Sequence, residues 1–326
     1  MTKKTTTISI KDIAREAGVG LGTASRAASG NGYVSKEAKE KVQAAMKKLG
    51  YVPSHPARVL RSHKSNVVAF FVPTIAHPFF SAMAQTISRE LAKNGYRMIL
   101  ALSEDDVAEE KEMRRMFEER LVDGAVFITH KVYPKLEINL PVVTIDRHLS
   151  DSVPFVTSNN YEATMQALSL LYEKGARRIG FLGGQPETES EVNLRHKAYL
   201  DFITEKGLPR LDLFENIDHG QEKRFAEEYF NRHGDSDACF ASSDYLALAL
   251  VREASKRGLS VPNSFKVIGY DGALDEMVDY PKVSTMKQDI EAMGEKVVSL
   301  LLSLMKGKET PHKNEIPVTY VPGETA

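Results

Sequence analysis

The stretch Ser9–Ser35, SIKDIAREAGVGLGTASRAASGNGYVS, decides the fold of the first part of this chain. Ser9 can cap a first helix, and Gly18 supplies the backbone freedom that ends it. A second helix over residues 21–29 turns its alanines inward. That orientation leaves an outer face that can touch a partner, made of Leu21, Gly22, Thr23, Ser25 and Arg26.

A third helix is predicted over residues 35–49, where the apolar side chains recur on one stripe. These side chains are Ala38, Val42, Ala45, Met46 and Leu49. Packed on the first two helices, they close a small three-helix core. Two short helices joined by a tight turn and supported by a third are typical of a helix-turn-helix, which presents its second helix to DNA.

Charge is divided unevenly along the chain. Up to Ser65 there are 13 Lys and Arg against four Asp and Glu, a balance of +9, and the rest holds 30 against 40, a balance of −10. A basic head on an acidic body favours binding of a polyanion through the head alone. Taken without the helix spacing, the same lysines are equally typical of a solvated surface.

Composition narrows the class of protein. A length of 326 residues predicts two or three domains, and 42% hydrophobic residues predict ordinary globular cores. The single cysteine, Cys239, lies in an apolar run, so we expect a buried side chain and a reducing compartment, the cytoplasm. The sequence shows no export signal, no membrane span, no metal-ligand spacing and no P-loop, so we expect no membrane partner, metal or cofactor.

A linker is predicted after the third helix, because Pro53 and Pro56 cannot continue it. Residues 57–62 have the length of about one and a half helical turns. A helix that short rarely forms alone in water. We therefore expect this segment to be coil until a partner orders it.

From Asn66 onward, apolar strand candidates alternate with amphipathic helix candidates. The strands are expected at 67–72, 97–102, 125–128, 142–146, 155–157, 178–182, 238–242, 266–270 and 283–286. The helices are expected at 79–94, 107–120, 162–174, 189–206, 222–232, 245–256 and 290–305. Alternation of this kind predicts parallel sheets with helices on both faces and ligands at the carboxyl ends of the strands. Two strands in succession before residue 160 predict two sheets, with a cleft between them as the default pocket.

The chain resembles the lactose/galactose repressor (LacI/GalR) family of bacterial transcription regulators along nearly its whole length. The resemblance rests on IKDIAREAGV, TASR, YVSKEAKEKVQAAMKKLGYVPS, VPTIAHPFF, VDGAVF, RRIGFLGG, ASSDYLALA, VIGYDG and STMKQD. It implies an all-α helix-turn-helix head and a two-lobed α/β effector domain with parallel sheets, like a periplasmic binding protein. The implied boundaries are 1–52 for the head, 53–66 for a hinge segment and 67–326 for the effector domain, with lobes at about 67–158 plus 288–318 and at 159–287.

The resemblance also implies which residues touch DNA. Leu21, Gly22 and Arg26 match major-groove positions, Thr23 and Ser25 match backbone-contacting positions, and Ser9 and Tyr33 match flanking contacts. Leu60 matches an apolar wedge that enters the minor groove. The less favoured alternative is that it packs against its own linker. Two departures stand out. Gly20 replaces the usual capping Ser or Thr, and Gly22 replaces a larger side chain, so we expect a second helix that frays without DNA and a changed base readout.

The ligand-binding positions of the family fall on His77, Phe79, Asp146, Arg147, Arg195, His219, Ser243, Asp271 and Gln288. Carboxylates can accept hydroxyl hydrogen bonds, and an arginine can hold a hydroxyl, a carboxylate or a phosphate. Simpler interpretations stay open: His77 can be a turn residue, Arg147 can pair with Asp146, and Arg195 can lie on a solvated face. Ser243 stands where the family has Asn, and Gly272 stands where a second acid is common.

The partners implied are double-stranded operator DNA, a small sugar or sugar phosphate as effector, and a second copy of the chain. The function implied is a repressor of a carbohydrate-utilisation operon. Two alternatives remain. One is a catabolite-control regulator whose corepressor is a phosphorylated protein, and the other is an α/β enzyme. The enzyme is disfavoured because Gly183-Gly184 is an isolated pair and no acid–base pair can be placed.

Overall fold

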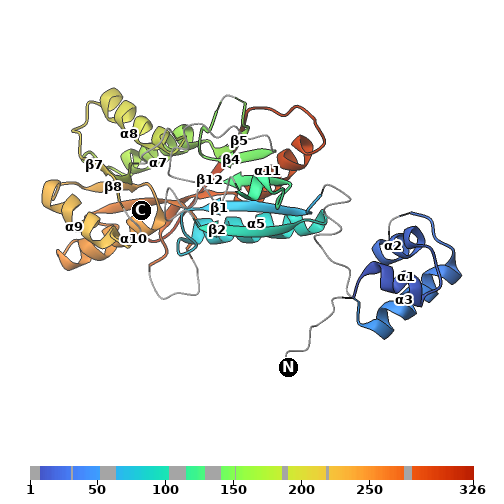
Figure 1. The fold of residues 1–326 in the computed structure, drawn as a ribbon. Coiled ribbons are helices and arrows are strands. Elements are labelled where there is room, and N and C mark those ends of the chain that lie inside the picture. The colour runs from blue at the N-terminus through green and yellow to red at the C-terminus, as the bar shows by residue number, and fades with distance from the viewer. Residues whose placement is uncertain are drawn as a thin grey trace. The chain divides into compact units, whose positions relative to one another are not determined.

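The computed structural model describes residues 8–30, 32–51, 64–102, 115–128, 141–150, 152–185, 190–217, 220–274 and 281–326. The chain divides into two compact units, Met1–Ser65 and Asn66–Ala326 (Figure 1). Leu60, His219 and the predicted linker helix lie outside the described residues. Among the described residues, no helix is both long enough and apolar enough to cross a membrane.

The first unit consists of three helices, as predicted, and is called the head below. They are α1 (Ile10–Glu16), α2 (Leu21–Ser29) and α3 (Lys36–Leu49). Their shared core is small and rich in alanine: Ile13, Ala14, Ala17, Ala24, Ala27, Val42 and Ala45 are buried. Met46 and Leu49, which we expected inside, are only partly buried at its edge.

Local signals in the sequence set the ends of these helices. The carboxylate of Asp12 accepts hydrogen bonds from the amide of Ser9 at 3.0 Å and from its hydroxyl at 2.7 Å, at the start of α1. Gly18 has a φ of +62°, the left-handed conformation that lets the chain turn towards α2. Helix α3 begins after Ser35, whose hydroxyl accepts from the amide of Ala38 at 3.3 Å.

The second unit contains two six-stranded sheets among the described residues (Figure 1). The first has the order β11-β5-β4-β3-β1-β2, with every pair parallel. Its strands are β1 (Val67–Val72), β2 (Arg97–Leu102), β3 (Gly124–Phe127), β4 (Val142–Ile145), β5 (Phe155–Ser158) and β11 (Lys313–Ile316).

The second sheet has the order β12-β10-β9-β8-β6-β7. Its strands are β6 (Ile179–Gly184), β7 (Asp212–Glu215), β8 (Ala238–Ala241), β9 (Lys266–Asp271), β10 (Ser284–Gln288) and β12 (Val318–Val321). We did not predict β7, β11 and β12, which are four residues each and lie at sheet edges, where the apolar signal is weak. β12 also departs from the predicted parallel pattern, because it runs antiparallel to β10.

Helices cover the sheets. Helices α5 (Pro78–Lys93) and α11 (Ile290–Leu304) pack together on the first sheet, with Phe79, Met83 and Ile87 of α5 in its core. Helices α7 (Asn160–Glu173) and α8 (Asn193–Lys206) pack on one face of the second sheet. Helices α9 (Glu222–Arg232) and α10 (Asp244–Lys256) pack on the other face, where Cys239 is buried. Burial of both faces matches the prediction for parallel strands.

The chain passes between the two sheets at three places, which we call the crossovers: residues 158–160, 288–290 and 316–318. The first two meet, because the hydroxyl of Ser158 at the end of β5 donates to Oε1 of Gln288 at the end of β10. Polar groups at the carboxyl ends of strands from both sheets therefore come close together.

Candidate functional site

The exposed face of the head is the one that the sequence predicts. Ala24 and Ala27 of α2 are buried, whereas Leu21 is 47% exposed and Tyr33 is 92% exposed. Gly22 and Arg26 are also exposed, and Thr23 and Ser25 are partly buried. An exposed leucine and tyrosine have no core to support, so they are free to contact a partner. Ser9 has a structural role as well, since it bonds Asp12 at the start of α1.

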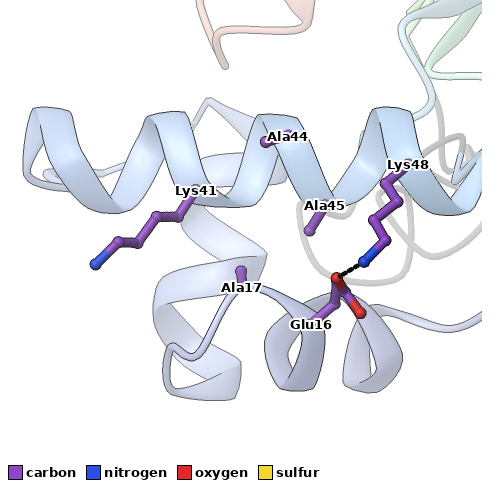
Figure 2. A pocket seen from close by; sticks show the side chains of 6 residues that line it. All are labelled: Glu16, Ala17, Lys41, Ala44, Ala45 and Lys48. Carbon is purple, nitrogen blue, oxygen red and sulfur yellow. Dashed lines mark hydrogen bonds and ion pairs between the residues drawn. The ribbon is translucent and has the colours of Figure 1, made fainter.

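A shallow groove lies between α1 and α3 and contains no predicted site residue (Figure 2). It is lined by Glu16, Ala17, Lys41, Ala44, Ala45 and Lys48. Lys48 reaches across it to Glu16, with 2.6 Å between Nζ and Oε1, while Lys41 pairs with Glu37 on its own helix. The groove is thus the packing seam of two helices, bordered by exposed ion pairs that contribute little to stability.

The second unit brings most of the predicted ligand residues together. The strand-end cluster, as we call it, consists of His77, Asp146, Arg195, Asp244, Asp271 and Gln288, with the buried hydrogen-bond partners described below. Asp146 follows β4 and Asp271 ends β9, and both are buried with positive φ, +57° and +101°. Non-glycine residues held in this conformation are strained, and such strain concentrates at binding sites.

Asp271 has three polar neighbours in this cluster, Gln288, Arg195 and His77. Nε2 of Gln288 donates to its Oδ1 at 2.8 Å. Nη1 of Arg195 lies 4.0 Å from the same oxygen, and Nε2 of His77 lies 4.0 Å from Oδ2. Burial raises the pKa of Asp271 to about 8, although Arg195 acts to lower it. The carboxyl group is therefore largely neutral at pH 7 and can donate a hydrogen bond as well as accept one.

Arg195 is buried and contacted on three sides. The interpretation that it lies on a solvated helix face is therefore wrong. Its Nε donates to Oδ1 of Asn160 at 2.7 Å, and its Nη1 donates to the carbonyl of Ser242 at 2.8 Å. The guanidinium carbon lies 3.5 Å from the ring centroid of Tyr270. The tyrosine hydroxyl also donates to Oδ1 of Asn160, at 3.1 Å. This arrangement leaves the position of the guanidinium little freedom.

A chain of hydrogen bonds, which we call the relay, links Arg195 to Asp146 through the first crossover. Nδ2 of Asn160 donates to Oγ1 of Thr157 at 3.1 Å, and the Thr157 hydroxyl donates to Oδ1 of Asp146 at 2.7 Å. Burial raises the pKa of Asp146, while Arg195 and Thr157 act to lower it. The two predicted ligand residues thus belong to one hydrogen-bonded unit although they follow strands of different sheets.

Three predicted residues lie at the starts of helices: His77 and Phe79 at α5, and Ser243 at α10. His77 is the N-cap of α5, where its Nδ1 accepts from the amide of Phe79 at 3.3 Å, and its ring packs on Tyr245 at 5.2 Å. Phe79 itself lies in the core of the first sheet. Ser243 caps α10 by accepting from the amide of Leu246 at 3.4 Å. Hence the turn interpretation of His77 holds, but its ring also borders Asp271.

Arg147 is buried next to Asp146. Burial lowers the pKa of Arg147 to about 10, with Asp146 acting to raise it, and the backbone at Arg147 forms an isolated bridge with Ser190. The charge of Asp146 thus favours the protonated guanidinium, as expected for neighbouring opposite charges.

Four residues of the cluster and the relay were missed by the sequence analysis: Thr157, Asn160, Asp244 and Tyr270. Asp244 is buried and accepts from the Thr285 hydroxyl and the Ala273 amide, and burial raises its pKa to about 6. Thr157 and Asn160 flank the predicted junction of the two sheets. The signal in the sequence that could have identified them is that they are polar residues at the point where the chain passes from one sheet to the other.

Comparison with known proteins identifies the family of this chain. Residues 9–54 match the model for bacterial regulatory proteins of the lacI family, and residues 168–326 match a periplasmic binding protein-like domain. The ribose operon repressor of Bacillus subtilis is 32% identical over 97% of this chain and 98% of that protein. The sucrose operon repressor of Streptococcus mutans is 29% identical over 97% and 98%.

A solved structure supports the same assignment. The transcriptional regulator CelR in complex with cellobiose aligns with a TM-score of 0.73 and 27% identity, covering 98% of this chain and 100% of that one. The three-helix head, the paired parallel sheets and the full-length similarity agree, and the chain belongs to the LacI family of bacterial regulatory proteins.

Proposed function

We propose that this protein represses a carbohydrate-utilisation operon, binding a near-palindromic operator as a homodimer under the control of a small sugar or sugar phosphate. The observation that carries the proposal is the strand-end cluster, in which buried acids and an arginine converge where two sheets meet. Alternating donors and acceptors of this kind suit a polyhydroxylated ligand. The full-length relatives are repressors of ribose and sucrose operons, so they support a regulator rather than an enzyme. We propose that it acts in the cytoplasm.

For operator binding, we assign α2 to the major groove. Leu21, Gly22 and Arg26 face the base edges, and Thr23 and Ser25 face the backbone, with Ser9 and Tyr33 beside them. The +9 balance of the first 65 residues supplies the phosphate attraction. Leu60, outside the described residues, is proposed as the wedge in the minor groove.

For effector binding, we assign the hydroxyl contacts to Asp271, Arg195 and Asp146. Asp271 can accept or donate, because its raised pKa keeps it protonated near neutral pH. Gln288 and His77 border the same carboxyl. Arg147, Ser243, Phe79 and His219 complete the proposed set, although Phe79 is a core residue in the form described and contributes only through a rearrangement of α5.

A homodimer follows from the half-site geometry, since one head can read only half of a palindrome. The exposed apolar side chains of the second unit include Ile99, Leu100 and Leu102 of the edge strand β2, which are 39%, 37% and 42% exposed. An edge strand with an apolar outer surface is suited to contact with another chain.

The proposed switch couples the strand-end cluster to the segment 53–66. A ligand that binds both sheets favours one arrangement of the lobes about the crossovers. In the dimer, the distance between the two copies of segment 53–66 then changes. The free energy of ordering these two copies on DNA changes with it. A coupling of about 1–3 kcal/mol changes operator affinity by roughly 5–150-fold.

The test has two parts. Purified protein is screened by thermal shift against D-ribose, sucrose, cellobiose and their phosphates, and each ligand that stabilises it is added to an operator-binding assay. We expect at least one carbohydrate to raise the melting temperature and to change the affinity for DNA. A protein that binds no duplex from its own genome at low ionic strength would overturn the proposal.

A further inference from the structure

In the head, the side chain of Arg26 lies between two glycines. A Cβ atom built on Gly32 would stand 3.0 Å from Cδ of Arg26 and 3.6 Å from its Cγ. A Cβ atom built on Gly22 would stand 3.9 Å and 4.0 Å from the two terminal nitrogens of the guanidinium. The aliphatic stem of Arg26 therefore rests against the backbone of Gly32, and its charged end lies beside Gly22, one turn back along α2.

The two glycines act in different ways. Gly32 has a φ of +94°, which disfavours any side chain, and a Cβ there would also be closer to the Arg26 stem than ordinary contact allows. Gly22 lies in regular helix, where side chains lean towards the N-terminus and meet the residue four positions away. A Cβ alone fits there, but a branched side chain would compete with the guanidinium for the same volume.

We propose that Gly32 and Gly22 are positioning residues for base readout by Arg26. Gly32 lets the stem of Arg26 lie against the head. Gly22 leaves space for the guanidinium at the start of α2. Arg26 then reads the base pair that a side chain at position 22 would otherwise contact. This inference rests on the proposed operator binding through α2. A guanidinium suits the O6 and N7 acceptors of guanine, and a restrained stem loses less freedom when it binds.

The experiment uses the full chain and a library of random duplexes. Selection with the wild type defines the preferred half-site, and Arg26→Ala identifies the base pair that Arg26 reads. We expect Gly32→Ala to lose the preference at that base pair by about fivefold or more, the lower end of what one good base contact supplies. The slope of affinity against salt stays unchanged, because the charge of Arg26 remains.

Gly30→Ala is the matched control. Gly30 has a φ of +73°, so an alanine there meets the same kind of backbone strain, but nothing lies within 4 Å of its added Cβ. This variant should keep the base preference of the wild type. A second pair of variants avoids the strain altogether. Gly22→Leu should weaken or shift the preference at the same base pair, and the smaller Gly22→Ala should do so much less.

The outcomes separate the inference from the function on which it rests. If Gly32→Ala keeps the same base preference as Gly30→Ala, or weakens binding to all duplexes equally, Gly32 has no positioning role. If Gly22→Leu and Gly22→Ala show the same base preference, Gly22 has no positioning role. This pair of variants also tests the proposal if Gly32→Ala does not fold. A wild-type chain that selects no sequence instead overturns the operator function itself, and Arg26 then has no base to read.

Discussion

The head and the strand-end cluster differ in how they hold the side chains that we propose to bind partners. In the head, Tyr33 is 92% exposed and Leu21 47%, and the helices rest on a core of small residues. In the second unit, Asp146, Arg195 and Asp271 are each only 5% exposed, and hydrogen bonds fix their positions. A surface that must fit a long, charged duplex can adapt on binding, whereas a site for a small polar ligand must be pre-formed. Substitutions should therefore damage stability in the second unit and recognition in the head.

The largest effect is expected for Arg195→Ala. The substitution removes the buried donor of two hydrogen bonds, to the Asn160 side chain and to the Ser242 carbonyl. A hydrogen bond to a charged group is worth about 1.5–3 kcal/mol, so we expect a total loss of roughly 3–6 kcal/mol. Urea unfolding of the second unit measures this loss.

Arg232→Ala is the matched control, because Arg232 pairs with Glu215 at the surface and the two side chains are 46% and 48% exposed. Its loss should cost under about 1 kcal/mol. Equal losses for the two variants would show that burial does not distinguish the strand-end cluster from the surface.

A second effect is a fall in stability as pH rises from 6 to 8. The pKa of Asp271 is about 8 in the folded protein and near 3.8 when unfolded, so the folded state holds an extra proton in this range. The stability linked to that proton is complete below pH 4 and is lost as the pH rises through 8. The slope approaches about 1.4 kcal/mol per pH unit for one group.

Asp271→Asn should flatten this slope, because the amide does not titrate. Asp244 has a pKa of about 6, so its own contribution falls mainly below the range measured. Unfolding midpoints in urea at pH 6, 7 and 8 make the comparison. An unchanged slope in the variant would mean that Asp271 is already ionised at pH 6.

The relay offers a third, smaller test. Thr157→Val keeps the shape of the side chain but removes the hydroxyl that joins Asp146 to Asn160. Leaving these buried groups unsatisfied costs about 1–3 kcal/mol. Thr157→Ser retains the hydroxyl and should recover most of the loss in the same unfolding assay. If serine is more harmful than valine, the methyl group rather than the hydroxyl matters.

The smallest effect concerns the start of α2. Gly20 is its N-cap and offers no side-chain acceptor, and nothing lies within 4 Å of a Cβ built there. Gly20→Ser should stabilise the head by a few tenths of a kcal/mol, while Gly20→Ala should not. Amide exchange over residues 21–28 should be slower in the serine variant, and slower in the wild type when DNA is bound. Equal exchange in free and bound protein would contradict the fraying of α2.

The contrast between the head and the strand-end cluster also explains how much of the structure could be predicted from the sequence. The head was predictable because caps, turns and core positions lie within a few residues of one another, so α2 was placed at residues 21–29. The strand-end cluster is assembled from positions up to about 200 residues apart, such as His77 and Asp271. The family resemblance identified every member of the cluster except Asp244. It did not reveal Asn160 or Thr157, whose role depends on distances that only the folded sheets define.

The crossovers also constrain how the protein is made on the ribosome. The first sheet takes its edge strand β11 from residues 313–316, so β5 can pair only with β4 until those residues have been translated. At roughly 5–20 residues per second, that delay from β5 to β11 lasts several seconds or more. An unpaired strand edge is a site for unwanted association during that time. The head, whose three helices are all encoded before residue 50, has no such wait and can fold first.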